Sequence, residues 1–249
     1  MKRTLRVVTL NIHKGLSHFN RRMVIHELRE GLRGLDPDLV FLQEVQGLNQ
    51  RFTMRYRTCP VEPQYEFLAG DRWQHVYGVN AVYDHGHHGN AILSRYPFVS
   101  FENQDVSDHR FERRGLLHTV VSVPGWRRNL HCVCVHLSLH ERGRNRQLEA
   151  ISGRLEELAS RDVPIIVAGD FNDWRQRATA ILEHRLGMTE VSVAHLGRVQ
   201  PTYPSLLPLL RLDRIYVRGF KVAASRVHKG KPWSMLSDHL AVSAEIERA

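Results

Sequence analysis

Polar side chains recur in this sequence at the points where short apolar runs end. The series comprises Asn11, Glu44, His136, Asp170, Asn172, Asp213, Asp238 and His239. In an α/β scaffold, catalytic groups tend to lie on the loops that follow strands. Each residue alone has an ordinary explanation as a turn former, a helix cap or a core histidine. Their repeated placement beside apolar runs indicates a shared site.

The acids of this series predict a bound cation. Glu44, Asp170 and Asp238, gathered at strand ends, would repel one another unless a positive ion lay between them. Together with Asn172 they offer oxygen ligands. Such ligands suit Mg²⁺ or Mn²⁺ rather than zinc, which prefers thiolates.

A histidine at the end of the series suits proton transfer. His239 directly follows Asp238, and the carboxylate of Asp213 lies upstream. A carboxylate that holds a histidine ring in one tautomer is typical of a general base. Asp170 could fill the same role, and the residue types alone leave both assignments open.

The elements that must position these residues follow from the hydrophobic pattern. The expected strands are 5–12, 39–44, 90–93, 116–123, 130–137, 164–168, 212–217, 221–225 and 240–246, and the expected helices are 21–35, 48–57, 144–160 and 176–185. Residues 47–88 otherwise lack a clear period, and Pro124-Gly125-Trp126 indicates a hairpin. Hairpins mixed with β-α-β units predict an α/β sandwich with mixed sheets. No change in composition marks a boundary, so we expect a single domain over residues 1–249.

Composition excludes several classes of protein. Hydrophobic residues make up 42% and charged residues 24%, which excludes disordered, collagen-like and coiled-coil chains. The longest apolar runs, such as Val163–Gly169, are too short to span a bilayer, and the N-terminus shows no signal peptide. The chain has only three cysteines, which argues for reduced thiols. We therefore expect a cytoplasmic protein.

The charge points to an anionic partner. Lys and Arg total 35 against 26 Asp and Glu, a net charge of +9, and 30 of the 35 cations are arginine. Arginine binds phosphate through paired hydrogen bonds, which suits a phosphate-bearing partner. A codon bias that places arginine on solvated faces would explain the surplus equally well.

The ordered motifs resemble the endonuclease/exonuclease/phosphatase superfamily, which includes DNase I-like nucleases, abasic-site endonucleases, inositol polyphosphate phosphatases and bacterial sphingomyelinases. The matching segments are Leu10-Asn11-Ile12, Gln43-Glu44-Val45, Asn90-Ala91-Ile92-Leu93-Ser94-Arg95, Val135-His136-Leu137, Gly169-Asp170-Phe171-Asn172, Arg211-Leu212-Asp213-Arg214-Ile215 and Ser237-Asp238-His239. The resemblance extends from Arg6 to Ile246, and the Gly-Asp-Phe-Asn and Ser-Asp-His motifs are the most specific. It implies a four-layer α/β sandwich, with two mixed sheets packed face to face and helices outside. It also implies metal-dependent hydrolysis of a phosphoester by water.

The resemblance also assigns roles. Glu44 corresponds to the principal metal carboxylate, with Asn11 and Asp238 beside it, and Asn11, Arg113 and Asn172 would contact the phosphate. Asp170 and Asn172 would orient the nucleophile, and His239 would be the catalytic histidine oriented by Asp213. His136 corresponds to a residue that stabilises charge in the transition state. Arg114 is the alternative to Arg113 if the register differs by one residue.

Substrate choice depends on the segments between the motifs. Basic and aromatic residues alternate over 47–88, namely Arg51, Phe52, Arg55, Tyr56, Arg57, Arg72, Trp73, His75 and Tyr77, which suits a nucleic acid unless the aromatics belong to the core. For His85, His87 and His88 we favour a solvated loop over a metal site.

Apolar residues at 203–210, with Trp233 and Met235, suit contact with a phospholipid or a membrane surface, although we favour packing of these leucines beneath their loop. No insertion resembles the DNA-grasping loops of abasic-site endonucleases, and no second histidine–acid pair like that of secreted DNase I is evident. Both departures argue against a dedicated DNA-repair role.

Three functions follow from these observations. The first is a metal-dependent nuclease or phosphodiesterase acting on nucleic acid. The second is a phosphatase or phosphodiesterase acting on a phospholipid or small phosphoester. The third is an inactive binding protein of the same fold, against which the intact series of polar residues argues.

Overall fold

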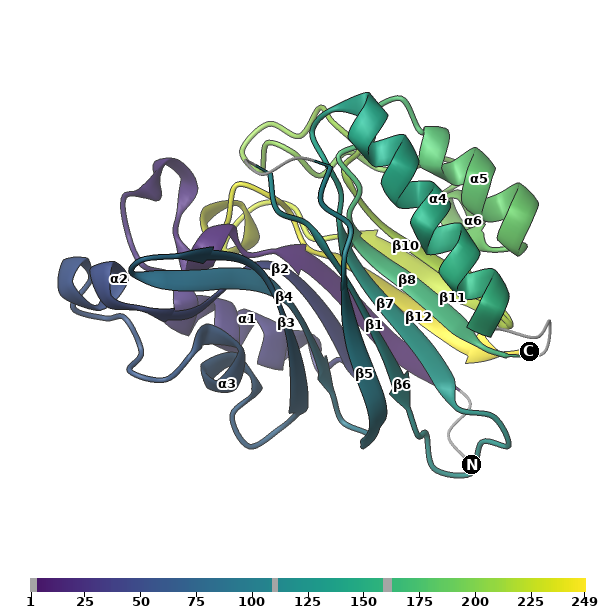
Figure 1. Ribbon diagram of the computed structural model, residues 1–249, viewed down its shortest axis with the longest axis horizontal. Coiled ribbons are helices and arrows are strands. Elements are labelled where there is room, and N and C mark those ends of the chain that lie inside the picture. The colour runs from purple at the N-terminus through teal and green to yellow at the C-terminus, as the bar shows by residue number, and fades with distance from the viewer. Residues whose placement is uncertain (1–3, 109–111, 159–162) are drawn as a thin grey trace.

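A computed structural model describes residues 4–108, 112–158 and 163–249 of the chain (Figure 1). Its strands are β1 (Thr4–Asn11), β2 (Leu39–Asn49), β3 (Gln74–Tyr83), β4 (Gly86–Ser94), β5 (Phe98–Asp105), β6 (Gly115–Val121), β7 (Leu130–His136), β8 (Ile165–Asp170), β9 (Thr189–Glu190), β10 (Asp213–Arg218), β11 (Phe220–Val227) and β12 (Val242–Arg248). Its helices are α1 (Ile25–Leu35), α2 (Gln50–Arg55), α3 (Gln64–Ala69), α4 (Glu141–Leu158), α5 (Arg177–Leu186) and α6 (Val191–Leu196). Short 3-10 turns are η1 (His13–Gly15), η2 (His18–Asn20) and η3 (Trp233–Met235). Within these described ranges, no helix is long and apolar enough to cross a membrane.

The strands form two mixed sheets. The first sheet has the order β11-β12-β1-β2-β4-β3, and the second has the order β5-β6-β7-β8-β10-β9. Among the described strands, the pairs β1–β2 and β7–β8 are parallel, because a crossover that contains helix α1 or α4 connects them. The other described pairs are antiparallel. The hairpin predicted at Pro124-Gly125-Trp126 is confirmed as the connection between β6 and β7.

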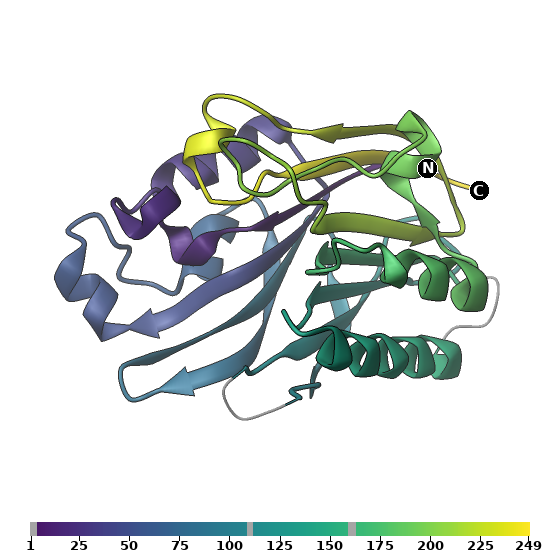
Figure 2. The ribbon, with the colours of Figure 1, turned by 90° about the horizontal axis from the view of Figure 1, so that it is seen from above.

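The two sheets pack face to face and helices cover both outer faces (Figure 2). Side chains of both sheets, such as Phe41 from β2 and Ile166 from β8, meet in the layer between them. Helix α1 buries Leu28 and Leu32 against the first sheet, and helix α4 buries Leu148 with α5 against the second. The predicted four-layer α/β sandwich is confirmed.

The prediction for residues 47–88 was largely wrong. The structure places a helix there at α2, as expected, but also helix α3, strand β3 and the start of β4. Strand β3 is an edge strand whose residues alternate only weakly in polarity, so its pattern resembles a loop. Strand β5 is likewise an exposed edge strand, and the short β9 and α6 carry too few residues to show a period.

Candidate active site

Three neighbouring strands of the second sheet bring His136, Asp170 and Asp213 side by side. His136 ends β7 opposite Asp170, which ends β8, and Asp170 lies opposite Asp213 at the start of β10. Directly opposite residues project from the same face of a sheet, so the three side chains converge. His136 Nε2 lies 3.4 Å from Asp170 Oδ2, and all three residues are buried. The sheet register alone therefore assembles this part of the predicted site.

The turn after β8 holds Asp170 in place. Gly169 has a φ of +149°, and a Cβ at this position would lie 1.9 Å from the carbonyl oxygen of Val135 on β7. Only glycine permits this approach of the two strands. The backbone N–H of Asn172, at φ 49°, donates to Asp170 Oδ1 at 2.9 Å, and its side-chain amide donates to the carbonyl oxygen of Leu137 at 2.9 Å. Asn172 thus braces the aspartate, and its contact with substrate phosphate stays a prediction.

His239 lies between two carboxylates. Its Nδ1 is 2.8 Å from Asp213 Oδ2, and its Nε2 is 3.8 Å from Asp170 Oδ2. The Ser237 hydroxyl donates to the carbonyl oxygen of Asn11 at 2.7 Å and accepts the His239 backbone N–H, which ties the Ser-Asp-His segment to the end of β1. The predicted pairing of His239 with Asp213 is present in the structure.

The proton affinities of this group follow from its burial and charges. Burial opposes the imidazolium, but the carboxylates of Asp213 and Asp170 outweigh it and raise the pKa of His239 to about 10. Burial raises the pKa of Asp170 to about 6, even though His239 acts in the opposite direction. In the free protein at neutral pH, His239 therefore holds a proton, and Asp170 is the group able to accept one.

Glu44 lies at a β-bulge in the first sheet. Leu42 pairs with Ala91 and Val45 pairs with Gly89, so Gln43 and Glu44 together oppose a single residue of β4. Glu44 has a φ of 55°, a conformation that L-residues rarely adopt, and the bulge redirects its side chain. The sequence pattern predicted that the strand ends at Glu44, whereas β2 continues to Asn49.

Two residues that the sequence analysis missed border the acids of the first sheet. His13 Nδ1 lies 3.3 Å from Asp238 Oδ2 and 4.0 Å from Glu44 Oε2, and Lys14 Nζ lies 3.6 Å from Glu44 Oε2. Burial opposes ionisation of Glu44, but the neighbouring side chains of His136, Lys14 and His13 outweigh it and lower its pKa to about 2. The available signal was position, because both residues follow the Leu-Asn-Ile motif directly.

Glu44, Asp238 and Asn11 fit a divalent cation. The two carboxylates are partly exposed and direct oxygens towards the same neighbour, His13. Asn11 is fixed beside them, since its Oδ1 accepts the His13 backbone N–H at 3.1 Å and its Nδ2 donates to Asp170 Oδ2 at 3.1 Å. This set of hard oxygen donors without thiolates is suited to Mg²⁺ or Mn²⁺. Asp170, Asp213 and His239 also lie within 4.8 Å of one another, but there the protonated histidine already balances the acids.

A groove of about 910 Å³ opens beside Glu44. It is lined by Lys14, Glu44, Asn80, Ala81, Val82, Tyr83, His88, Asp105, Glu112, Arg113, Arg114, Leu139 and His140. Arg113 is half-exposed, with its Nη1 3.6 Å from Asp105, whereas Arg114 is mostly buried and donates to Glu112 at 3.0 Å. Burial and then the positive charge of Arg114 depress the pKa of His136.

Several of the aromatic residues over 47–88 serve the fold, which was the alternative to a contact with substrate. Trp73 is buried and donates to the carbonyl oxygen of Pro37, and Tyr77 stacks on Tyr65 at a centroid distance of 4.4 Å. None of those nine residues is among the described residues that line the groove.

The histidine cluster is not the solvated loop that we favoured. His87 and His88 belong to β4, and His88 lines the groove and pairs through Nδ1 with the Tyr83 hydroxyl at 3.0 Å. Burial lowers the pKa of His88 to about 4, so it is neutral at physiological pH. The prediction failed because Gly86 and Gly89 give this strand the composition of a turn.

The apolar loop at 203–210 does not bury its leucines, contrary to the packing that we favoured. Leu206, Leu207 and Leu209 are exposed, while the Tyr203 ring lies 4.8 Å from the His239 ring. Trp233, by contrast, is buried beside α1. The loop therefore contacts His239 at its base and presents apolar side chains to solvent at its tip.

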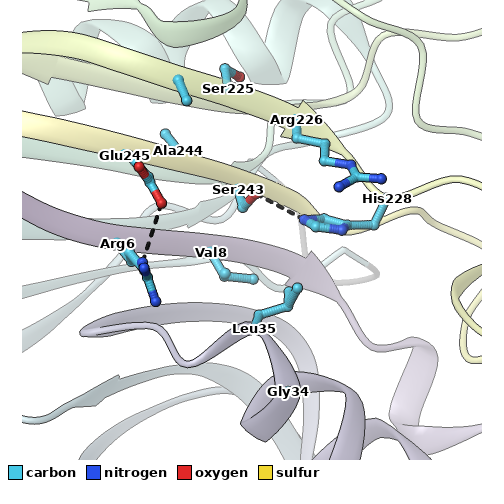
Figure 3. A pocket seen from close by; sticks show the side chains of 11 residues that line it. Arg6, Val8, Gly34, Leu35, Ser225, Arg226, His228, Ser243, Ala244 and Glu245 are labelled. Atoms are coloured by element: carbon cyan, nitrogen blue, oxygen red, sulfur yellow. Dashed lines mark hydrogen bonds and ion pairs between the residues drawn. The ribbon is translucent and has the colours of Figure 1, made fainter.

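A second pocket of about 280 Å³ lies apart from these residues, on the outer face of the first sheet (Figure 3). Arg6 pairs there with Glu245 at 3.2 Å, and His228 Nε2 lies 2.8 Å from the Ser243 hydroxyl. Four of its polar side chains are thus paired with each other across the sheet.

Comparisons with known proteins agree with this geometry. A family model described as "Endonuclease/Exonuclease/phosphatase family" matches residues 8–239. The chain is 44% identical over 244 residues to "Uncharacterized protein YbhP" of Escherichia coli (strain K12), covering 98% of this chain and 96% of that protein. An endonuclease/exonuclease/phosphatase from Beutenbergia cavernae superimposes with a TM-score of 0.80 at 22% identity, over 100% of this chain and 72% of that one. Danio rerio TDP2, crystallised with a single strand DNA product, superimposes with a TM-score of 0.71 at 21% identity, over 98% and 99%.

Proposed function

The chain belongs to the endonuclease/exonuclease/phosphatase family, and on this premise we propose that it hydrolyses phosphodiesters with the aid of a divalent cation. The single observation that carries the proposal is the position of Asp170. Its carboxylate receives a hydrogen bond from Asn11 of the first sheet and lies within 4 Å of both His136 and His239. A general base, two histidines and the cation ligands therefore share one small volume.

The chain's own residues divide the reaction between them. Asp170, with a pKa of about 6, accepts the proton of the attacking water, while His239 keeps its proton and faces the developing negative charge. Asp213 holds the His239 ring, and Arg114 adds positive charge on the groove side. Glu44 and Asp238, with Asn11, would hold a divalent cation, which would supply positive charge against the phosphate oxygens.

We propose nucleic acid as the substrate. Lys14, Arg113 and Arg114 line the groove and can bind successive backbone phosphates, and Tyr83 offers a ring for base stacking. The groove opens directly at Glu44, so a strand bound there would reach the cation ligands. The single-stranded DNA bound by TDP2 is consistent with such a mode on this fold.

A phospholipid or small phosphoester is the second candidate substrate. The observation that favours it is the loop at 203–210, which contacts His239 through Tyr203 and exposes Leu206, Leu207 and Leu209. Aliphatic side chains beside a phosphate site suit an acyl chain better than a nucleotide.

One parallel assay tests these proposals. The purified protein is incubated with Mg²⁺ or Mn²⁺ and either supercoiled plasmid, single-stranded oligonucleotide, bis-p-nitrophenyl phosphate or phospholipid. We expect cleavage of the oligonucleotide and the soluble diester, and loss of both activities with chelator. An intact oligonucleotide and plasmid beside hydrolysed phospholipid would replace nucleic acid by the second candidate. No hydrolysis of any substrate would favour the inactive binding protein.

A further inference from the structure

Five exposed apolar side chains gather at one corner of the molecule. They are Phe19, Leu206, Leu207, Leu209 and Met235, here called the rim surface, and each is between 44% and 69% exposed. Phe19, Leu206 and Met235 line one shallow pocket of about 350 Å³, although they are far apart in the sequence. Figure 2 shows the segment after β1 and the yellow turn η3 at the same end of the molecule. An apolar cluster of this kind on a water-exposed face indicates a contact surface.

The segments that form the rim surface carry positive charge and no acid. Residues 13–24, 199–212 and 226–237 contain neither aspartate nor glutamate, although acids make up about one residue in ten of the chain. Their cations are Lys14, Arg21, Arg22, Arg211, Arg226, Lys229 and Lys231. Arg21 and Arg22 line the same pocket as Phe19, and Arg22 also pairs with Glu27 of α1 at 2.6 Å. These seven cations, here called the basic collar, lie in the same segments as the apolar side chains, and Arg21 and Arg22 lie directly beside them.

Hydrogen bonds connect the rim surface rigidly to the catalytic residues. The Ser205 hydroxyl donates to the carbonyl oxygen of Ser237 at 2.7 Å, and the Ser205 backbone N–H donates to the carbonyl oxygen of Asp238 at 2.7 Å. The ring of Tyr203, in the same loop, contacts the ring of His239. Whatever binds the rim surface is consequently held beside the reacting phosphate.

We propose that the rim surface docks on an anionic lipid bilayer, with its apolar side chains in the headgroup region and its basic collar against acidic headgroups. Leucine and methionine neither stack on bases nor bond to phosphate, so a nucleic acid would leave them unpaired. A second copy of the chain would oppose one basic collar to another. Apolar side chains flanked by cations are the pattern of interfacial membrane binding. The inference goes beyond the proposed reaction, because it concerns where the protein works and not which bond it cleaves.

The test is sedimentation with vesicles, which requires no hydrolysis. Full-length protein is mixed with sucrose-loaded vesicles of phosphatidylglycerol and phosphatidylcholine or of phosphatidylcholine alone. We expect at least tenfold stronger binding to the anionic vesicles, and weaker binding at high salt. Leu207→Ser with Leu209→Ser should lower that binding at least tenfold and leave the thermal unfolding midpoint unchanged, because both side chains are exposed.

Matched controls make the outcome decisive. Val99→Ser with Phe101→Ser removes two apolar side chains that are 58% and 59% exposed on β5, and should bind as the unaltered protein does. Glu44→Gln should bind the vesicles as the unaltered protein does, because vesicle binding does not depend on the cation ligands. The vesicle test therefore stays valid even if the proposed reaction is wrong. Equal binding to both vesicle types, or binding that the leucine substitutions do not weaken, would overturn the proposal. So would a dimer in sedimentation equilibrium that the same substitutions dissociate.

Discussion

The two halves of the candidate site balance their charges differently. On the second sheet, the buried carboxylates of Asp170 and Asp213 face the protonated ring of His239, so the charges compensate one another within the protein. On the first-sheet side, Glu44 and Asp238 are partly exposed and meet His13 or Lys14 at 3.3 to 4.0 Å. The difference supports the proposed division of roles, in which the first group transfers a proton and the second exchanges its partners for a cation.

Removing the Asp170 carboxylate, which contacts residues of both groups, should cause the largest loss of activity. Asp170→Asn keeps the shape of the side chain but removes the proton acceptor, and should lower kcat on bis-p-nitrophenyl phosphate by about 10³-fold or more. Asp71→Asn on the surface is the control, with unchanged turnover expected. Activity within tenfold of the unaltered protein would exclude Asp170 as the base.

Removing the carboxylate that pairs with His239 on the second sheet should cause the next largest loss of activity. Asp213→Asn removes the partner of His239 Nδ1, so the pKa of His239 should fall from about 10 towards its ordinary value. Loss of the oriented ring should lower kcat by about 10²-fold. An NMR titration of the ring checks the first expectation and steady-state kinetics the second. A His239 pKa that stays near 10 in the variant would contradict the assigned partner.

Altering the first-sheet group should change the affinity for the cation rather than the transfer of the proton. Glu44→Gln should weaken Mn²⁺ binding by about 10- to 100-fold, as measured by calorimetry, and raise the Mg²⁺ concentration needed for half-maximal activity. Asp213→Asn serves as the comparison and should bind Mn²⁺ with little change. Equal losses of Mn²⁺ affinity in both variants would remove the distinction between the two halves.

The two arginines of the groove should differ in their effect on substrate binding. Arg114→Ala should raise KM on an oligonucleotide by about tenfold, because its mostly buried charge acts at His136, whereas Arg113→Ala at the rim should raise it by about twofold. Steady-state kinetics of the two variants provides the check. A larger rise in KM for Arg113→Ala than for Arg114→Ala would identify Arg113 as the phosphate-contacting arginine, as the sequence motif indicated.

A histidine outside the site shows the opposite shift and should have the smallest effect. His118 Nε2 lies 3.0 Å from His131 Nδ1, with no carboxylate partner among the described residues, and burial lowers the pKa of His118 to about 4. In the unfolded chain, His118 binds a proton near pH 6.5. The contribution of His118 to the free energy of unfolding is therefore complete above that pH and is lost as the pH falls towards 4. We expect a loss of about 2 kcal/mol between pH 7 and pH 4.5 in urea unfolding. His118→Leu should lessen this loss, and parallel pH curves for both proteins would contradict it.

The sequence predicted the parts of the fold and site that depend on local pattern. Asp170, His136 and Asp213 were identifiable because each adjoins an apolar strand, and strand register then brings them together without further information. Glu44 was identifiable as a residue, but the bulge that aims it was not, since the bulge depends on how β2 pairs with β4.

Residues whose role depends on distant contacts could not be found in this way. His13 and Lys14 matter because their loop folds back over Glu44 and Asp238, which lie far away in the sequence. His88 lines the groove only because the β3–β4 hairpin extends beside it. The exposure of Leu207 and Leu209 likewise depends on the Ser205 anchor, which leaves the tip of their loop without a core to enter.

The hydrogen bond from Asn11 to Asp170 has a consequence for the life of the protein in the cell. It joins the first strand of one sheet to a central strand of the other, and His239 reaches the same point just before β12. The group of Asn11, Asp170 and His239 cannot form in a chain that lacks residues 237–239. It cannot form either in a proteolytic fragment that contains only one of the two sheets. The proposed hydrolytic activity is therefore expected only from a chain in which both sheets have folded and packed together, and a partly folded or clipped copy should have none.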